Sequence, residues 1–258
     1  MKVKITFVLV IFILNVFLFA EIKSDHEAML MATLWQQTSA EYRALTFQAY
    51  NIAKLRLDED LKIQSDKKRA IVIDLDETVL DNSSFQAKSI IEGVTYYNDF
   101  DEWIELAVAK PVPGALEFLN YANDMGVNVF YISNRDSRHM KGTLKNLQKL
   151  GFPQVMESHI LLRDETSSKE PRRQKVAEDH FIVLYIGDNL IDFEDIFRKK
   201  SIEERFTAVE KFKDEFGDRF IILPNPMYGE WEKTLYGGTR KIPQEEKKKK
   251  LYENLKSY

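Results

Sequence analysis

The sequence predicts an α/β protein in which a parallel β-sheet is covered by helices on both faces. Short apolar runs rich in β-branched residues alternate with longer amphipathic or charged segments along most of the chain. Strands that are buried on both faces have uninterrupted apolar runs of this kind, and their alternation with helices is typical of parallel sheets. A length of 258 residues is sufficient for one sizeable core with a small cap.

The expected elements follow one another in a regular order. Apolar residues at spacings of three and four predict an N-terminal helix over about residues 24–57. Apolar runs predict strands at residues 70–73, 127–132, 160–162, 181–186 and 220–223. Helices are expected over about residues 114–124 and 137–150, from about Lys169, and, long and charged, from about Ile191. Gly126 and Gly151 favour helix ends where they stand. The predicted core is therefore a Rossmann-like parallel sheet.

A small, mainly helical cap is expected beside this core. Residues 81–108 are polar, aromatic and irregular in pattern, and they are too long for an ordinary strand-to-helix loop. We assign the core to about residues 66–80 and 110–225. The N-terminal helix, the insert at 81–108 and about residues 226–258 would form the cap, so that residues 21–258 make a single domain. The tail after Arg240 is expected to be a solvated helix or a flexible arm.

The first twenty residues have the pattern of a secretory signal peptide. Lys2 and Lys4 give a positive start, and residues 5–20 are almost entirely apolar. As a helix, this run would reach roughly 24 Å at ~1.5 Å per residue, short of the ~30 Å hydrocarbon core of a bilayer. We therefore expect export, with cleavage after Ala20. Leu18 matches the cleavage pattern poorly, so an uncleaved anchor, with membrane contact, remains an alternative.

The composition excludes several kinds of function. Cysteine is absent, which removes disulfides, thiolate zinc sites, cysteine nucleophiles and any lipid-modified cysteine. The formal net charge of −4 gives no reason to expect a nucleic-acid polymer as a partner. The histidines are scattered and lack an Arg-His-Gly motif, which argues against a phosphatase with a histidine nucleophile.

Four polar clusters each follow a predicted strand. Because the carboxyl ends of parallel strands meet at one edge of a sheet, these clusters should converge there. They are Asp74 with Asp76, Ser133 with Asn134 and Arg135, Lys169, and Asp188 with Asp192. Phosphoryl transfer requires such parts. A carboxylate can attack phosphorus, a second can carry a proton, Mg²⁺ can bridge carboxylate and phosphate oxygens, and a hydroxyl and a lysine can hold the remaining oxygens.

Three motifs resemble those of a known family. Residues 71–82, IVIDLDETVLDN, resemble motif one of the haloacid-dehalogenase-like phosphatases, and residues 132–135, ISNR, resemble motif two. Residues 187–193, GDNLIDF, are similar to a motif of the class C bacterial acid phosphatases, the family of outer-membrane lipoprotein e. The similarity extends over about residues 30–232. It implies a haloacid-dehalogenase-like fold and Mg²⁺-dependent hydrolysis of small-molecule phosphomonoesters, including nucleoside 5′-monophosphates. Many members of the family are dimers, so the resemblance also implies a homodimer.

The resemblance also implies a role for each matching residue. Asp74 would be the phosphorylated nucleophile and a metal ligand. Asp76 would be the general acid/base, with its backbone carbonyl on the metal. Asp188 would be the other direct metal ligand. Asp192 would orient the lysine or a metal-bound water without binding the metal itself. The phosphate-binding residues would be Ser133, Asn134 and Lys169.

Some alternatives remain open at the level of sequence. Arg172, Arg173 and Lys175 lie on the same predicted helix as Lys169 and could replace it. Tyr228 matches an aromatic position that can stack on a nucleobase, although packing is the alternative. A phosphotransferase would use the same intermediate, and a non-catalytic surface or storage protein could retain the fold. The presence of Asp74 favours an enzyme, because a protein that had lost catalysis would no longer need its nucleophile.

Overall fold

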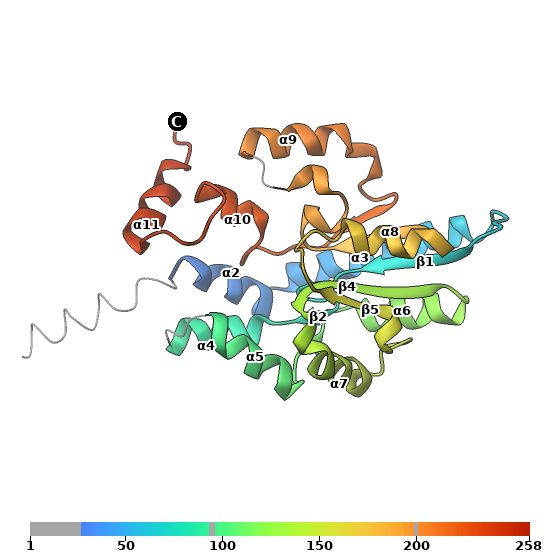
Figure 1. Cartoon of the computed structure of the whole chain (residues 1–258). Helices are drawn as coiled ribbons and strands as arrows, with labels where there is room; N and C mark the ends of the chain where they lie inside the picture. Colours follow the sequence, from blue (N-terminus) through green and yellow to red (C-terminus); the bar gives the residue numbers. More distant parts are fainter. Residues whose placement is uncertain (1–26, 93–95, 199–200) are drawn as a thin grey trace, which may run out of the picture.

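A five-stranded parallel sheet forms the centre of the molecule (Figure 1). The computed structural model describes residues 27–92, 96–198 and 201–258. The strand order is β5-β4-β1-β6-β7, which places β1 in the middle. The strands are β1 (Lys68–Ile73), β4 (Asn128–Asp136), β5 (Ile160–Arg163), β6 (His180–Gly187) and β7 (Phe220–Ile222). Each of these strands was predicted from its apolar run, and the predicted α/β fold is confirmed.

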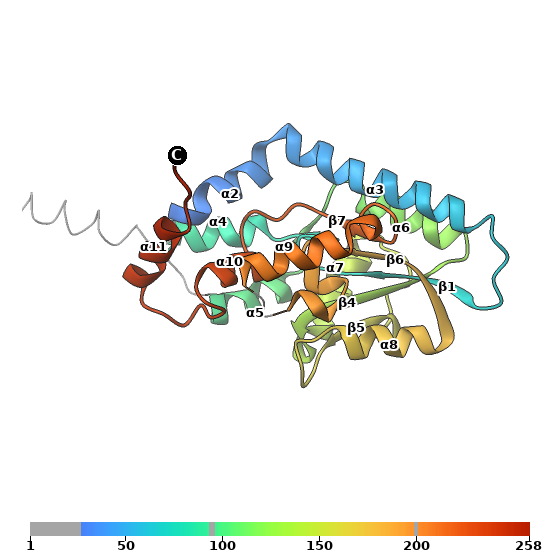
Figure 2. The same ribbon diagram turned by 90° about the horizontal axis from the view of Figure 1, so that it is seen from above.

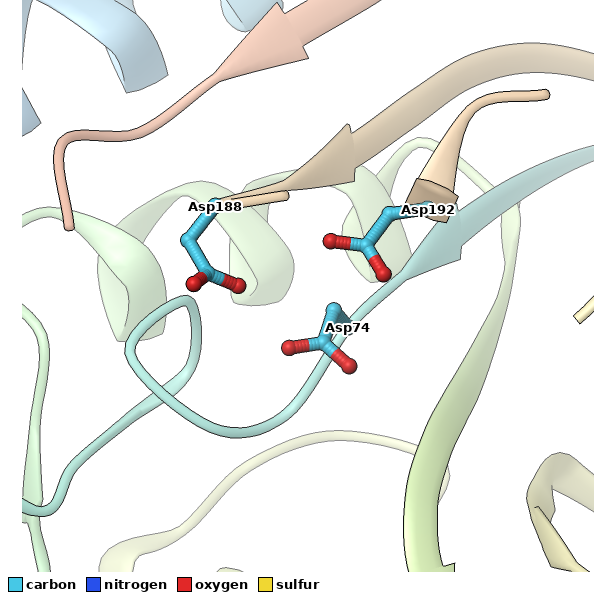
Figure 3. A group of neighbouring side chains, drawn as sticks. All are labelled: Asp74, Asp188 and Asp192. Carbon is cyan, nitrogen blue, oxygen red and sulfur yellow. The ribbon is translucent and has the colours of Figure 1, made fainter. Parts of the chain in front are cut away.

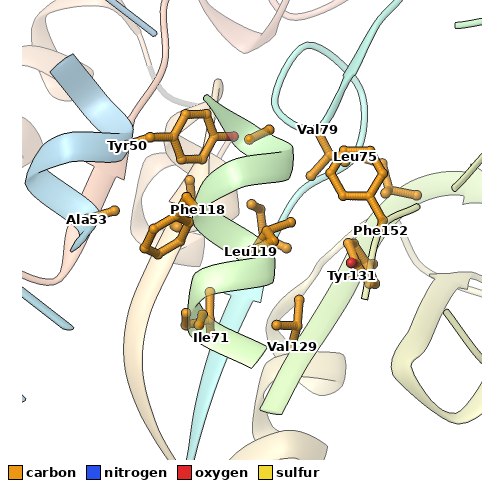
Figure 4. Packing of buried hydrophobic residues seen from close by; sticks show 14 of the residues in the cluster. Tyr50, Ala53, Ile71, Leu75, Val79, Phe118, Leu119, Val129, Tyr131 and Phe152 are labelled. Atoms are coloured by element: carbon orange, nitrogen blue, oxygen red, sulfur yellow. The ribbon is translucent and has the colours of Figure 1, made fainter. Parts of the chain in front are cut away.

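Helices cover both faces of the sheet, as the uninterrupted apolar strands require. On one face, Ala70 and Val72 of β1 pack with Val176 of α8 (Glu170–Asp179). On the other face, Ile71 and Ile73 belong to a larger core. This core lies under α3 (Ala40–Asp60), α6 (Ala115–Asp124) and α7 (Met140–Leu150). Figure 2 shows α3 and α8 on opposite sides of the sheet, and Figure 4 shows the side chains packed around α6.

The segment after β6 differs from the prediction. In place of a long helix from about Ile191, two short 3₁₀ turns cover Leu190–Asp192 and Asp195–Phe197. Phe193 and Phe197 are fully buried in a cluster with Phe220 of β7, and these two turns hold them there. The next helix, α9 (Ile202–Lys211), begins at a capping box formed by Ser201 and Glu204.

Three chain segments gather beyond the carboxyl ends of the strands (Figures 1 and 2). The single expected N-terminal helix is broken at Ser39, whose side chain caps α3; only α2 (Glu27–Thr38) lies in this region, whereas α3 packs on the sheet and not in the expected cap. The insert, expected to belong to a mainly helical cap, forms α4 (Ser83–Glu92) and α5 (Tyr96–Leu106). A short antiparallel pair, β2 (Leu80–Asp81) and β3 (Lys110–Pro111), joins its two ends. The C-terminal segment adds α10 (Glu230–Leu235) and α11 (Gln244–Glu253).

The helices between residues 27 and 258 that the structure describes are all too short or too polar to cross a membrane. The signal segment expected at residues 1–20 lies outside the described residues.

Candidate active site

Three aspartates meet where the central strands end. Asp74 directly follows β1 and extends its pairing, since its backbone N–H donates to the carbonyl of Ile186 at 2.9 Å. Asp188 follows β6, and Asp192 ends the first 3₁₀ turn. One carboxylate oxygen of each of the three lies within 4.8 Å of the others. Figure 3 shows the three side chains converging. Two of the four predicted clusters therefore come together as expected.

Gly187 makes this convergence possible. A Cβ atom at this position would lie 2.4 Å from Asp192 Oδ2 and 2.5 Å from Asp192 Cβ, so no larger residue fits. Asp192 Oδ2 also accepts a hydrogen bond from the backbone N–H of Asn189 at 2.9 Å. The glycine at the end of β6 thus lets the turn fold back and bring Asp192 beside Asp188.

Lys169 joins the carboxylates, whereas its three rivals do not. Its ammonium group forms ion pairs with Asp74 and, at 2.7 Å, with Asp192 Oδ1, and the residue is 4% exposed. Burial lowers the pKa of Lys169, but the two carboxylates more than offset this effect, so its net pKa is raised. Arg172 binds the backbone carbonyl of Ser133, and Arg173 pairs with Glu170. Lys175 is exposed.

The electrostatics of the cluster suit a divalent cation. Burial raises the pKa of Asp74 to about 7; Lys169 opposes this shift, and Asp192 adds to it. Burial and the neighbouring Asp192 and Asp74 raise the pKa of Asp188 well above its ordinary value. Asn225 donates to Asp188 Oδ2 at 2.8 Å and fixes its orientation. Carboxylate oxygens are ligands that Mg²⁺ prefers, and a cation among them would relieve their mutual repulsion. The residues present therefore fit a metal site.

Asp76 is held by a separate set of contacts. Arg135 Nη2 donates to its Oδ1 at 2.7 Å, and the Arg135 guanidinium is buried. Asn82 Nδ2 donates to the same oxygen at 2.8 Å, and Ser133 Oγ lies 3.4 Å from Oδ2. Burial raises the pKa of Asp76, but Arg135 and the hydrogen bonds outweigh it, and the net pKa is lowered. Asp76 and motif two thus meet across the β1–β4 pair.

The side chain of Asn134 is tied to α8. Arg172 Nη2 donates to Asn134 Oδ1 at 2.7 Å, and Arg172 Nη1 donates to the carbonyl of Ser133 at 2.5 Å. Ser133 Oγ accepts from the backbone N–H of Arg135 at 3.1 Å. The last residues of β4 are therefore held in place by α8, beside Asp76.

Tyr228 reaches the same region from the C-terminal segment. Its hydroxyl donates to Glu77 Oε1 at 3.0 Å. Glu77 is fully buried, and its other oxygen accepts from Gln36 Nε2 of α2 at 2.7 Å. Burial and nearby Asp81 raise the pKa of Glu77 to about 8, against the effect of these two hydrogen bonds. Tyr228 is thus placed next to motif one.

Sequence reasoning did not assign roles to Arg135, Asn82 or Glu77, although all three lie in the quoted motifs. The available signal was position: each stands within a few residues of a predicted catalytic group. Nothing in their own residue types says which distant group they contact.

A family model for the HAD superfamily, subfamily IIIB (acid phosphatase), matches residues 14–231. The chain belongs to this family. The subfamily IIIB chain is also similar to solved structures of the class C acid phosphatase from Bacillus anthracis, with 47% sequence identity and a TM-score of 0.88. That match covers 91% of this chain and 99% of the other. A second structure of the Bacillus anthracis enzyme, with tungstate bound, matches at the same identity. The resemblance inferred from the motifs is confirmed.

Two curated relatives of this subfamily IIIB chain come from plants. Acid phosphatase 1 of Solanum lycopersicum is 25% identical over 180 residues, and the stem 31 kDa glycoprotein of Glycine max is 27% identical over 165 residues. These matches cover 66% and 61% of this chain. The chain spans 62% and 58% of the lengths of these two relatives, about three fifths of each.

Proposed function

We propose that this protein is an exported, Mg²⁺-dependent acid phosphatase that hydrolyses phosphomonoesters through an aspartyl-phosphate on Asp74. The observation that carries the proposal is the position of Asp74 at the end of the central strand, in contact with Lys169 and beside Asp188 and Asp192. A nucleophile with a buried cation and further carboxylates around it is the arrangement that phosphoryl transfer needs. The match to class C acid phosphatases supports the same activity.

In this mechanism the nucleophile and the acid/base are different residues. A carboxylate oxygen of Asp74 attacks phosphorus while the bond to the leaving oxygen breaks, and Asp76 gives its proton to that oxygen. Asp76 then takes a proton from water, which attacks the aspartyl-phosphate and releases inorganic phosphate. Ser133, Asn134 and Lys169 hold the phosphate oxygens by hydrogen bonds and charge. The bound tungstate in the Bacillus anthracis enzyme, a tetrahedral oxyanion like phosphate, supports an anion site in this fold.

Asp74, Asp188 and the backbone carbonyl of Asp76 would hold the metal. When bound, Mg²⁺ would neutralise negative charge on the carboxylates and on a phosphate oxygen. Asp192 keeps Lys169 in place through its 2.7 Å ion pair, so that the ammonium group points at Asp74 and the transferring group.

Nucleoside 5′-monophosphates are the substrate class that we propose. Tyr228 supports this choice, because its hydroxyl bond to Glu77 fixes the ring close to motif one. Aromatic rings held in this way can stack on a nucleobase. The base would thus be bound by the cap while the phosphate lies at the sheet edge.

We further propose export and dimer formation. Lys2, Lys4 and the apolar residues 5–20 support export. Apolar side chains exposed along α2 and α3 support a homodimer, and they are Leu30, Met31, Leu34, Leu45, Phe47 and Leu55. Sedimentation of the purified protein at several concentrations tests the dimer.

The phosphatase mechanism is tested with p-nitrophenyl phosphate and inorganic Mg²⁺. A chelator should abolish turnover, and Mg²⁺ should restore it. Asp74→Asn should remove activity and the acid-quenched phosphoenzyme while keeping the circular dichroism spectrum. Asp179→Asn, an exposed aspartate at the end of α8, is the matched control and should keep full activity. An Asp74→Asn protein that still turns over the substrate would exclude this mechanism.

A further inference from the structure

The two oxygens of Asp76 are held unequally. Oδ1 accepts hydrogen bonds from Asn82 Nδ2 at 2.8 Å and from Arg135 Nη2 and Nε at 2.7 and 3.0 Å. The contacts of Oδ2 with described residues are longer, 3.2 Å to Arg135 Nε and 3.4 Å to Ser133 Oγ. An oxygen that already accepts three hydrogen bonds is a poor place for a proton. Oδ2 therefore keeps more of its hydrogen-bonding capacity for a bound substrate than Oδ1 does.

Trp103 of α5 fixes the orientation of Asn82. Its indole Nε1 donates to Asn82 Oδ1 at 2.8 Å, and Asn82 is fully buried. An indole N–H can only donate, and a carboxylate can only accept. The amide of Asn82 satisfies both neighbours in one orientation, with its oxygen toward Trp103 and its nitrogen toward Asp76. The chain Trp103, Asn82, Asp76 thus has a fixed direction.

The insert helix α5 is itself fastened to the core beside motif two. Asp101 of α5 contacts His139 Nε2 at 2.7 Å and Arg138 Nη2 at 2.9 Å. The ring of Phe100 lies 6.0 Å from the guanidinium carbon of Arg135. Helix α5 therefore reaches both groups that hold Asp76 Oδ1, Asn82 through Trp103 and Arg135 through Phe100.

We propose that Asn82 and Trp103 are positioning residues for the reaction: they anchor Oδ1 of Asp76 so that Oδ2 delivers the proton to the leaving oxygen. This inference rests on the proposed function, in which Asp76 is the general acid. As the bond from Asp74 to phosphorus forms and the bond to the leaving oxygen breaks, the proton moves from Asp76 Oδ2 to that oxygen. In the second half, Oδ2 takes a proton from the attacking water. The insert helix thereby takes part in proton transfer without touching the substrate.

The dependence of rate on the leaving group separates this role from a general packing role. Nitrophenolate is a stable anion that leaves without much help, whereas an alkoxide needs a proton as it departs. We would measure kcat/KM, which reports the step that releases the leaving group, with p-nitrophenyl phosphate and with glycerol 2-phosphate. General acid catalysis is worth on the order of 100- to 10,000-fold, and misplacing the acid should lose part of that factor.

Trp103→Phe is the sharpest variant because it removes the indole N–H and keeps an aromatic ring. We expect kcat/KM for glycerol 2-phosphate to fall about tenfold or more, and kcat/KM for p-nitrophenyl phosphate to fall much less. Asn82→Ala should change the ratio of the two kcat/KM values in the same direction and by a larger factor. In an Asp76→Asn background, Trp103→Phe should leave the ratio unchanged, because the group that it positions is gone.

Phe85→Leu is the matched control within the cap. The Phe85 ring packs against Phe100 and Trp103, with centroids 5.1 and 6.4 Å away, so this change loosens the insert and leaves the hydrogen-bond chain in place. Phe85→Leu should lower kcat/KM for the two substrates by the same factor. The inference is overturned if Trp103→Phe also lowers kcat/KM for both substrates by the same factor. A wild-type protein that hydrolyses neither ester, or an active Asp74→Asn variant, would instead reject the proposed function itself.

Discussion

Lys169 shows how much one side chain carries at this site. It is buried with Asp74 and Asp192, and its loss would leave these two carboxylates without their ion-pair partner. We expect Lys169→Met to lower kcat by about 100-fold or more, the usual cost of removing one group that stabilises transition-state charge. Lys175→Met, on the exposed side of α8, should keep wild-type kcat. Equal rates for the two variants would show that the phosphate is held by another group.

Tyr228 tests the choice of substrate at the same scale. Stacking on a base is worth about 1–3 kcal/mol, so Tyr228→Leu should raise KM for adenosine 5′-monophosphate by about tenfold. KM for glycerol phosphate, which has no base, should stay close to the wild-type value. Tyr228→Phe keeps the ring but loses the hydrogen bond to Glu77. Its KM for adenosine 5′-monophosphate should therefore lie between those of wild type and Tyr228→Leu. If Tyr228→Leu changes KM for the nucleotide and for glycerol phosphate by the same factor, Tyr228 has a packing role.

The residue scale also shows what sequence could not determine. Asp74, Asp188 and Lys169 were found because each follows a strand, and parallel strands bring their ends together. The partner of Arg135 was not found, because Asp76 lies 59 residues away and a guanidinium in motif two could equally bind phosphate. Spacing along the chain predicts the edge at which a residue lies, but it does not choose between two anionic partners at that edge.

Among the elements, the loop that ends β6 depends on one glycine. In Gly187→Ala the new methyl group would lie within 2.5 Å of Asp192 atoms, so Asp192 must move away from Lys169. We expect a folded protein whose kcat is lowered about tenfold or more, since misplacement of about 1 Å can cost 100-fold.

Gly126→Ala, at a glycine after α6, is the control for Gly187→Ala. Gly126 has a φ of +75°, and an added Cβ would meet nothing within 4 Å. The change should therefore lower the free energy of unfolding by about 1–2 kcal/mol, the cost of a left-handed non-glycine residue, and leave kcat intact. Urea unfolding and steady-state kinetics on both variants make the comparison. Wild-type kcat in Gly187→Ala would show that Asp192 does not need its present position.

Elements were predictable where their buried face was apolar. The strands met this condition, whereas α4 did not: of its buried residues Ser83, Phe85, Gln86 and Ser89, three are polar. Without an apolar stripe, α4 gave no helical periodicity. For the segment after Ile191, the prediction of a helix was wrong. Its charged residues suggested a surface helix, whereas the segment forms short turns with Phe193 and Phe197 in the core. The Ser201 and Glu204 capping box was present in the sequence and marks the true start of α9.

Across the whole molecule, Glu77 connects parts that are far apart in the chain. It belongs to the loop that carries Asp74 and Asp76, and it accepts hydrogen bonds from Gln36 of α2 and from Tyr228 of the C-terminal segment. One buried carboxyl therefore ties α2 and the C-terminal segment to this loop. Because Glu77 is fully buried, its protonation should affect the stability of the whole fold.

The pH dependence of stability in chelator tests this connection. The pKa of Glu77 is raised from 4.5 to about 8, mainly by burial, so between these values the folded protein holds a proton that the unfolded chain releases. The free energy of unfolding should therefore fall as the pH rises through this window, by up to about 1.4 kcal/mol per pH unit from this group. In Glu77→Gln the side chain is neutral throughout, so the free energy of unfolding should decline less steeply with pH. The stability of the variant relative to wild type should therefore increase toward the upper end of the window. Glu178→Gln, an exposed change on α8, should keep the wild-type slope. Urea unfolding of the three proteins measures the slopes, and equal slopes in wild type and Glu77→Gln would show that Glu77 does not hold its proton in the folded state.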